Sequence, residues 1–120
     1  TKASHFGHTL TIQRSVKPID IDRNKRVATL NEEMIRFPLT WRKWKEGDWF
    51  IPFGMKNRKK ISDFLIDTKV SLADKESVTV LESEGEIIWV VGHRIDDRYK
   101  VTESTERALI FQLAKADKNQ

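Results

Sequence analysis

Two runs rich in β-branched residues, 78–81 and 87–91, flank the polar tetrapeptide Ser-Glu-Gly-Glu at 83–86. Apolar runs joined by a short glycine-containing turn are typical of a β-hairpin. The two strands of a hairpin run in opposite directions, so this feature favours an antiparallel sheet over the parallel sheets of βαβ folds. We therefore expect antiparallel pairing to dominate.

Further short segments have the composition of strands. Residues 8–14 place Leu10 and Ile12 two positions apart between polar neighbours, which is the period of a half-buried strand. The other expected strands are 26–30, 36–40, 49–51 and 107–113, with polar turns at 31–33 and 46–48.

The first expected helix spans residues 62–68. Ser62 is a good N-cap residue, and Asp63 suits the positive end of the helix dipole. Ile61 and Ile66 have the spacing of a hydrophobic staple across the start of such a helix. These features together predict a helix that begins at a side-chain cap.

A second helical turn is expected at 71–77, where Ser71 and Asp74 have capping-box spacing. Several strands, short helices and no βαβ alternation predict an α+β fold. We expect a mostly antiparallel, sandwich-like β core with one or two short helices.

The 120 residues are enough for one domain with a modest core. The chain has no cysteine, which excludes disulfides and thiolate metal sites and favours a cytoplasmic location. No apolar run approaches the roughly 20 residues that span a bilayer, and no signal peptide is recognisable, so we expect no membrane partner. Because the chain begins Thr-Lys-Ala-Ser without a methionine, we expect it to be a piece of a longer protein.

Positive charge is concentrated in residues 41–60, WRKWKEGDWFIPFGMKNRKK. This segment holds seven of the 22 lysines and arginines but only two of the 18 aspartates and glutamates. It also holds three of the four tryptophans, and a basic, aromatic-rich segment on a nearly neutral body is typical of a nucleic-acid-binding surface. The three tryptophans of this segment either stack on bases or pack in the core. We expect Trp41 and Trp49 to be buried, and Trp44 is the best candidate for exposure. The fourth tryptophan, Trp89, is expected in the core.

Within this segment an irregular basic loop follows Pro52 and ends at the first expected helix. Gly54 allows the backbone to approach a ligand closely or to take a positive φ. A helix N-terminus offers unpaired N–H groups and a partial positive charge, so cations beside it favour phosphate binding. The alternative is a solvated loop whose cations only maintain solubility. The cations of the loop are Lys56, Arg58, Lys59 and Lys60.

The sequence contains no recognisable catalytic machinery. The phosphate-binding GxxxxGK[ST], the dinucleotide-binding GxGxxG, the zinc-binding HExxH and a Ser-Gly-Gly pyrophosphate loop are all absent. Asp96 and Asp97 lie near His93, but no further ligands complete a metal site, and Arg94 and Arg98 favour local ion pairs or a turn. We therefore expect this chain to hold no metal and no catalytic centre of its own.

The stretches RKWKEGDWFIPFGMKNRKKISDFLIDTKV (42–70) and GEIIWVVGHRIDDRYKVTEST (85–105) contain an ordered series of motifs. The series is Gly-Asp, Pro-x-Gly-Met-Lys, Lys-Lys, Ser-Asp-x-x-Ile-Asp, Glu-Ile-x-Trp-Val-x-Gly and Arg-x-Asp-x-Arg-x-Lys-Val. Its order and spacing strongly resemble the C-terminal domain of bacterial tRNA(Ile)-lysidine synthetases. Three positions depart from the family's usual pattern: Trp49, Asn57 and Ser71 stand where Arg, Gly and Pro are common.

The resemblance implies a domain layout. It covers residues 37–113 as a tRNA-binding C-terminal domain, with weakly matched strands at 1–36 and a polar tail at 114–120. It implies a parent ligase that uses ATP and Mg to join lysine to the wobble cytidine of isoleucine tRNA, which converts that base to lysidine. The implied partners are isoleucine tRNA with the CAU anticodon and an N-terminal catalytic domain of the same chain, which would hold the cofactors that this fragment lacks.

The resemblance also implies contact with the tRNA acceptor stem. In an A-form stem the major groove is deep and narrow, so a protein contacts mainly phosphates, 2′-hydroxyls and the minor-groove edge. We expect phosphate contacts from Lys56, Arg58, Lys59 and Lys60, from a second cluster of Arg42, Lys43 and Lys45, and from Arg94 and Arg98. The residues expected to shape the site are Gly47, Asp48, Gly54, Ser62 and Asp63.

Two other functions are compatible with the same residues. One is a protein-interaction module, in which the tryptophan-rich segment docks onto other parts of its own chain. The other is a general RNA- or DNA-binding domain without preference for tRNA.

Overall fold

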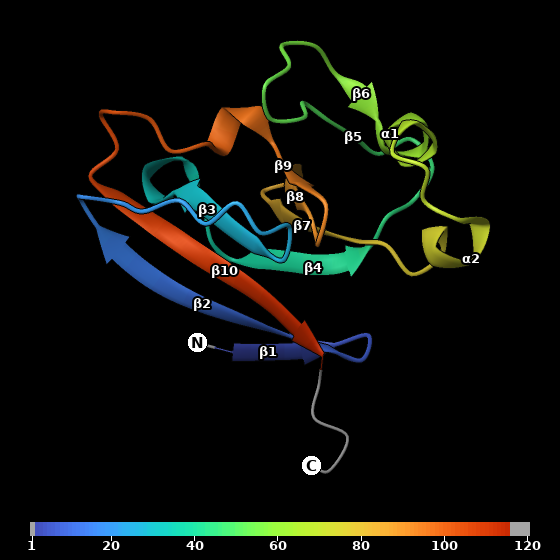
Figure 1. Cartoon of the computed structure of the whole chain (residues 1–120), viewed down its shortest axis with the longest axis horizontal. Helices are drawn as coiled ribbons and strands as arrows, with labels where there is room; N and C mark the ends of the chain where they lie inside the picture. Colours follow the sequence, from blue (N-terminus) through green and yellow to red (C-terminus); the bar gives the residue numbers. More distant parts are fainter. Residues whose placement is uncertain (1, 116–120) are drawn as a thin grey trace.

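The computed structural model describes residues 2–115 and consists of two four-stranded sheets, a two-stranded ribbon and short helices (Figure 1). The first sheet has the order β1 (Lys2–His5), β2 (His8–Val16), β10 (Arg107–Lys115), β3 (Val27–Asn31). The second has the order β4 (Leu39–Lys43), β7 (Thr79–Ser83), β8 (Glu86–Val90), β9 (Arg94–Ile95). The ribbon pairs β5 (Trp49–Phe50) with β6 (Lys59–Lys60).

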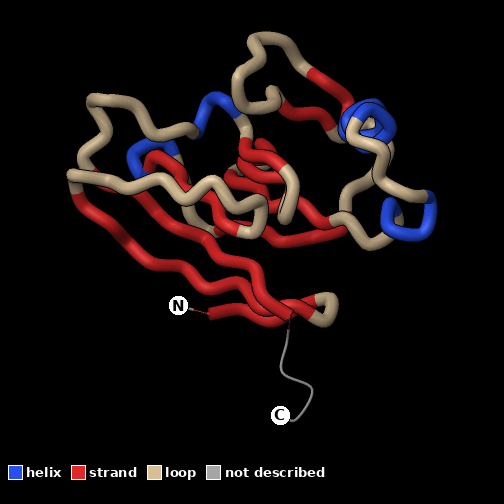
Figure 2. Tube along the Cα trace, in the orientation of Figure 1, coloured by secondary structure: helices blue, strands red, loops and turns tan. Residues whose placement is uncertain are grey.

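The two α-helices lie together at one edge of the molecule, next to the ribbon, and the long strands of the first sheet form the opposite edge (Figure 2). The helices are α1 (Ile61–Asp67), α2 (Leu72–Lys75) and the 3-10 turns η1 (Glu32–Met34) and η2 (Asp97–Tyr99). All strand pairs within the sheets and the ribbon are antiparallel. The predicted α+β, mostly antiparallel, sandwich-like fold is confirmed.

The second sheet is covered on both faces, which makes the fold three-layered. On one face Trp89 packs with Leu30 and Phe111 of the first sheet. On the other face Val80 packs with Phe50 of the ribbon and with residues of α1. This arrangement places the ribbon and α1 on the side of the second sheet away from the first sheet (Figure 1).

The apolar run in β8 follows from this double coverage. Ile87 to Val90 are all buried, as expected for a strand that contacts apolar layers on both faces. Ile88 is an extra residue on β8, because the register passes from Leu81–Trp89 to Glu82–Ile87. Trp89 is 1% exposed, which confirms its predicted place in the core.

The predicted hairpin is β7–β8. Its two turn residues, Glu84 and Gly85, both have positive φ, at 49° and 83°, as a two-residue type I′ turn requires. Residues 8–14, 26–30 and 107–113 correspond to β2, β3 and β10 and are also confirmed. The last strand continues through Ala114 and Lys115, so it includes the first two residues of the expected tail, and residues 116–120 lie outside the described residues.

The strand expected at 36–40 begins later, at Leu39. The backbone of Arg36 is hydrogen-bonded to the Ser83 side chain and not to a neighbouring strand. The Ser83 hydroxyl accepts the N–H of Arg36 and donates to the carbonyl of Arg36, both at 2.8 Å. Pro38 has no N–H to contribute to a ladder. The pairing with β7 therefore starts at Leu39, opposite Ser83.

The predicted cap of α1 is wrong. The helix begins at Ile61, and its N-cap residue is Lys60, which makes no side-chain capping bond. Ile61 is buried, and its N–H donates to the Asp48 carbonyl at 2.9 Å, so tertiary contacts determine where the helix begins. The expected staple is also wrong, because Ile66 is 65% exposed.

The second helix follows its local signals. Ser71 is the N-cap of α2, and its hydroxyl accepts the N–H of Asp74 at 3.1 Å, which confirms the predicted capping spacing. The helix ends at Lys75, two residues before the predicted end.

Residues 2–36 belong to the same fold as the rest. The long strand β10 lies between β2 and β3 and pairs with both along most of its length. The first third of the chain and its last strand therefore form one sheet.

Candidate nucleic-acid interface

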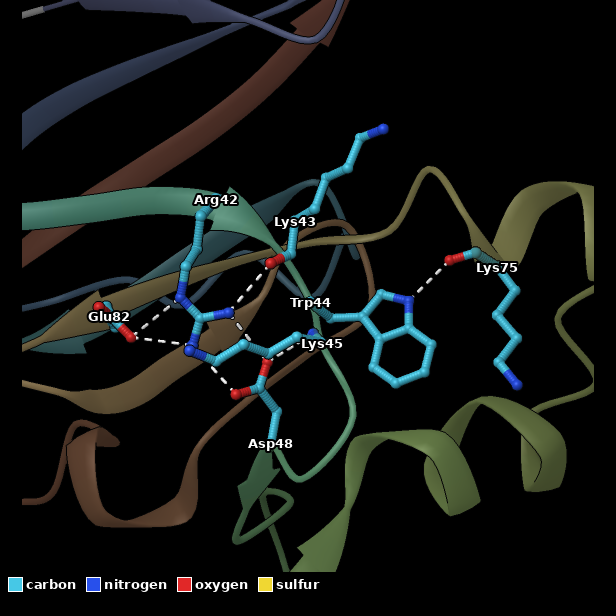
Figure 3. Close-up of polar contacts among 7 residues, drawn as sticks. All are labelled: Arg42, Lys43, Trp44, Lys45, Asp48, Lys75 and Glu82. Atoms are coloured by element: carbon cyan, nitrogen blue, oxygen red, sulfur yellow. Dashed lines mark hydrogen bonds and ion pairs between the residues drawn. The ribbon is translucent and has the colours of Figure 1, made fainter.

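Arg42 lies in a cluster with two carboxylates at the end of β4 (Figure 3). Its guanidinium donates to both oxygens of Asp48, at 2.9 and 3.1 Å, and to Glu82 at 3.0 and 3.2 Å. Hydrogen bonding to Asp48 raises the pKa of Arg42. The charge of Arg42 is therefore balanced by two carboxylates of the domain itself.

The neighbouring lysines differ from Arg42. Lys43 and Lys45 are exposed, and their ammonium groups have no acidic partner within residues 2–115. The Lys43 side chain extends away from Asp48 (Figure 3). Lys45 lies in the turn closed by Asp48, whose carboxylate accepts the Lys45 N–H at 2.8 Å.

The tryptophans are all tied into the domain. Trp41 donates from Nε1 to the Thr79 hydroxyl, and Trp44 donates from Nε1 to the Lys75 carbonyl, both at 2.8 Å. Trp41, Trp44 and Trp49 are each partly buried. We expected Trp41 and Trp49 to be buried and Trp44 to be more exposed, and the structure shows no such difference.

Trp49 is the centre of a cationic surface on the ribbon. Trp49 pairs with Lys60, so the two side chains lie on the same face of the ribbon. The Arg58 guanidinium carbon lies 4.0 Å from the centroid of the Trp49 ring, and that of Arg98 lies 5.1 Å from it. We call these four residues, Trp49, Arg58, Lys60 and Arg98, the Trp49 face.

Lys59 points to the opposite face of the ribbon. It pairs with Phe50, which is completely buried, and it forms an ion pair with Asp67 at the end of α1. Lys59 therefore covers the core beneath α1, whereas Lys60 is exposed and lacks an acidic partner within the described range.

The backbone of the basic loop is fixed from η2. Gly54 has a φ of +88°, in agreement with the predicted possibility of a positive φ. Its N–H donates to the Asp97 carboxylate at 3.0 Å. That hydrogen bond, with a smaller contribution from Lys100, lowers the pKa of Asp97. The exposed Lys56 follows two residues later, on a loop held at its base.

Asp96 is completely buried and connects the loop to Arg98. It accepts the N–H of Ile51 at 2.9 Å and the side chain of Arg98 at 2.9 and 3.0 Å. Arg98 also pairs with Glu86 at 3.1 Å. The predicted structural role of the Asp96–Asp97 pair, with Arg98 in a local ion pair, is confirmed.

The remaining predicted residues lie in several different places. Gly47 and Asp48 line a hollow of about 110 Å³ together with Trp49 and Arg98. Asp63 is exposed on the first turn of α1. Arg94 lies elsewhere, over the ring of Phe64 at 5.3 Å. Ser62 is half-buried and contributes no capping bond.

Within residues 2–115, no three His, Asp or Glu side chains are grouped so that they could hold a metal ion. The same range contains no helix of sufficient length and apolarity to cross a membrane.

Residues 39–111 match the family model described as the TilS substrate C-terminal domain. The chain belongs to this family. The resemblance read from the motifs of the sequence is thereby confirmed.

Named relatives of this TilS domain are tRNA(Ile)-lysidine synthases. The protein from Parabacteroides distasonis is 53% identical over 109 residues, which are 89% of this chain and 25% of the relative. The protein from Bacteroides thetaiotaomicron is 41% identical over 93 residues, which are 78% of this chain and 22% of the relative. The chain thus spans about a quarter of the length of these curated relatives.

Solved structures support the fold of the TilS domain. A crystal structure of a TilS C-terminal domain superposes with a TM-score of 0.78 at 17% identity, covering 93% of this chain and 87% of that one. An N-terminal fragment of the phenylalanyl-tRNA synthetase β-subunit from Pyrococcus horikoshii superposes with a TM-score of 0.69 at 16% identity, covering 89% and 39%.

Three carboxylates of this TilS domain were not predicted as part of the site. Glu82 holds Arg42, Glu86 holds Arg98 and Asp67 holds Lys59. Glu82 sits diagonally across from Arg42, because Arg42 pairs with Val80. That relationship follows from the strand register and has no signal in the local sequence.

Proposed function

We propose that this chain is the domain that recognises the tRNA acceptor stem in an ATP-dependent tRNA(Ile)-lysidine synthetase. The observation that carries the proposal is the Trp49 face, a cationic surface at the ribbon in a member of the TilS C-terminal family. In the parent enzyme a catalytic domain would bind ATP and Mg and modify isoleucine tRNA in the cytoplasm. This domain would contribute substrate binding and selection.

The cations divide into those that contact RNA and those that hold the surface. Arg58, Lys60 and Lys56 are exposed and lack acidic partners within residues 2–115, so they are the proposed phosphate contacts. The Trp49 ring fixes the position of the Arg58 guanidinium while leaving the residue exposed, and such preorganisation reduces the entropy lost on binding. Arg42 and Arg98 hold the surface through their ion pairs.

Lys43 and Lys45 form the proposed second set of contacts. They lie at the end of β4 and in the turn before Trp49, and both are exposed. A phosphate backbone is a continuous track of negative charge, so a second patch of cations along it raises affinity and fixes register.

The salt dependence of RNA binding tests this proposal. Lys56→Gln and Lys60→Gln should each reduce the slope of log K against log salt concentration by roughly one unit. The matched control is Lys2→Gln on β1, the outermost strand of the first sheet. Binding of an isoleucine tRNA acceptor-stem duplex is measured by fluorescence anisotropy at several salt concentrations, and unchanged slopes for both variants would remove the ribbon from the interface.

Docking onto other parts of the parent chain is the second candidate function. Ile66 on α1 and Leu72 on α2 are 65% and 82% exposed, so the two helices offer apolar side chains to a partner surface. Ile66→Ser with Leu72→Ser should weaken association with a separately expressed catalytic part of a relative and leave duplex binding unchanged if this candidate is correct.

A further inference from the structure

A hollow of about 280 Å³ lies beside β3, and none of the residues proposed as duplex contacts lines it. Much of its wall is apolar and comes from distant parts of the chain. The apolar lining includes Ile21, Val27, Phe53 and Val101. Ile21 and Phe53 are 54% and 49% exposed, so apolar surface is open to a ligand at this place.

One polar side chain in the wall of this hollow has no partner. Thr29 is 5% exposed, and its Oγ1 is buried without a hydrogen-bond partner in the part of the chain that the structure describes. Buried hydroxyls in folded proteins are nearly always hydrogen-bonded, so this exception calls for a structural explanation. Thr29 is one of the residues that line the hollow, so the hollow combines an apolar wall with a polar side chain that has no partner within residues 2–115.

The hollow is also cationic. Arg23, Lys25, Arg94 and Lys100 line it, against the single carboxylate of Asp22. Within residues 2–115 only Lys100 of these four has an acidic partner, Asp97. The cations at the rim are therefore available to an anion.

A second hollow of about 590 Å³ lies next to the first. The two share Lys25, His93 and Arg94, and the larger one adds Arg26 and Lys69. The pKa of His93 is lowered by burial and by the charge of Lys25, which is consistent with a positive potential at the junction. We call the two neighbouring hollows the Lys25 groove.

An apolar wall, a hydrogen-bonding group and cations at the rim match the three parts of a nucleotide. The base is flat and apolar on its faces with polar edges, and the phosphate is anionic. A base inside a duplex is stacked on both faces and cannot enter such a hollow, whereas an unpaired base at the end of an RNA can.

We propose that the Lys25 groove binds an unpaired ribonucleotide segment that extends from the duplex held by the ribbon. One base enters the smaller hollow beside Thr29, and the adjoining phosphates contact Lys25 and Arg94. The proposal rests on the proposed function, because the ribbon would bring the end of the RNA to the groove.

Four RNA probes test the groove with the 120-residue chain. They are a blunt duplex, the same duplex with a four-nucleotide 3′ extension, the same duplex with an abasic extension of equal charge, and the tetranucleotide alone. The natural extension should tighten binding about tenfold over the blunt duplex, which is the contribution of roughly one well-stacked base. The abasic extension should lose most of this gain, because it supplies phosphates without a base.

Two variants locate the effect. Thr29→Val is nearly isosteric and removes the hydroxyl, and Lys25→Gln removes a charge at the rim. Both variants should lose most of the affinity that the extension adds. Their affinity for the blunt duplex should equal that of the wild type. Lys115→Gln on β10 is the matched control and should keep the full gain. Urea unfolding of each variant verifies that the fold is retained.

The outcomes distinguish the groove from the duplex site. Equal affinity for the extended and blunt duplexes, or a gain that survives both variants, would overturn the groove. If the blunt duplex does not bind at all, the proposed function fails, and the groove is then judged by the tetranucleotide alone. In that case chemical-shift changes at Thr29 and His93 support the groove, and their absence overturns it.

Discussion

The guanidinium of Arg42 donates hydrogen bonds to both carboxylate oxygens of Asp48, at 2.9 and 3.1 Å. This pair closes the turn between β4 and β5, because the same carboxylate accepts the N–H of Lys45. The Asp48 carbonyl accepts the first N–H of α1, from Ile61. A single aspartate therefore connects the second sheet, the ribbon and the helix beneath the basic surface.

Replacing Asp48 should lower the free energy of unfolding by more than an ordinary substitution in a surface turn does. Asp48→Asn leaves Arg42 with Glu82 as its only carboxylate partner and weakens the bonds that close the turn. Because both partners are largely buried, the expected loss in the free energy of unfolding is about 1–3 kcal/mol. Urea unfolding followed by tryptophan fluorescence measures it.

Asp63→Asn is the matched control for this change. Asp63 is exposed on α1 and makes no ion pair within residues 2–115, so its replacement should alter stability by no more than about 0.5 kcal/mol. Equal urea midpoints for Asp48→Asn and the wild type would contradict the connecting role of Asp48.

The adjacent Lys59 and Lys60 should behave differently on substitution. Lys60 is exposed on the Trp49 face, so Lys60→Gln should reduce the salt slope of duplex binding by roughly one unit. Lys59 is paired with Asp67 on the other face, so Lys59→Gln should change the slope less. Parallel anisotropy titrations of the two variants measure the difference, and a larger effect of Lys59→Gln would mean that the opposite face of the ribbon contacts the RNA.

Features determined by neighbouring residues were predictable from the sequence. The β7–β8 hairpin has its turn residues between its two strands, and the cap of α2 needs only Ser71 and the N–H of Asp74. In both cases the local preference and the tertiary fold agree, which is the usual condition for a correct prediction.

Features determined by distant residues were not predictable. Glu82 is 40 residues from Arg42, and its contact depends on the register of β4 against β7. Ser62 satisfies the local rule for a cap, yet the packing of Ile61 moves the start of α1. The strand β1 is exposed along its whole length, so it has no apolar alternation to reveal it and forms by pairing with β2.

Gly54 should be required for the shape of the basic loop. Its φ of +88° is unfavourable for any residue with a Cβ, although no atom within 4 Å would clash with one. Gly54→Ala should therefore destabilise the fold by about 1–2 kcal/mol through backbone strain alone. It should also weaken duplex binding, because the loop carries Lys56 and Arg58.

Asp97→Asn is the companion variant for the loop. It weakens the bond to the Gly54 N–H without imposing backbone strain, so it should weaken duplex binding with a smaller loss of stability than Gly54→Ala. Urea unfolding and anisotropy titration of both variants measure the two effects. Undiminished duplex binding by both would show that a fixed loop conformation is not needed.

Stability should depend on pH through His93. Burial, and then the charge of Lys25, lowers the pKa of His93 below its ordinary value of 6.5, so the folded state binds protons less readily than the unfolded state. The contribution of His93 to the free energy of unfolding is fully present above pH 6.5, the ordinary pKa of histidine. It is lost as the pH falls through the lower pKa that His93 has in the folded state. His93→Gln should reduce the difference in unfolding free energy between pH 7.5 and pH 5.5. A pH profile of His93→Gln parallel to that of the wild type would contradict the assignment.

A phosphate bound beside Lys25 should oppose the lowering of the His93 pKa. The tetranucleotide should therefore raise the His93 pKa in an NMR titration of the wild type.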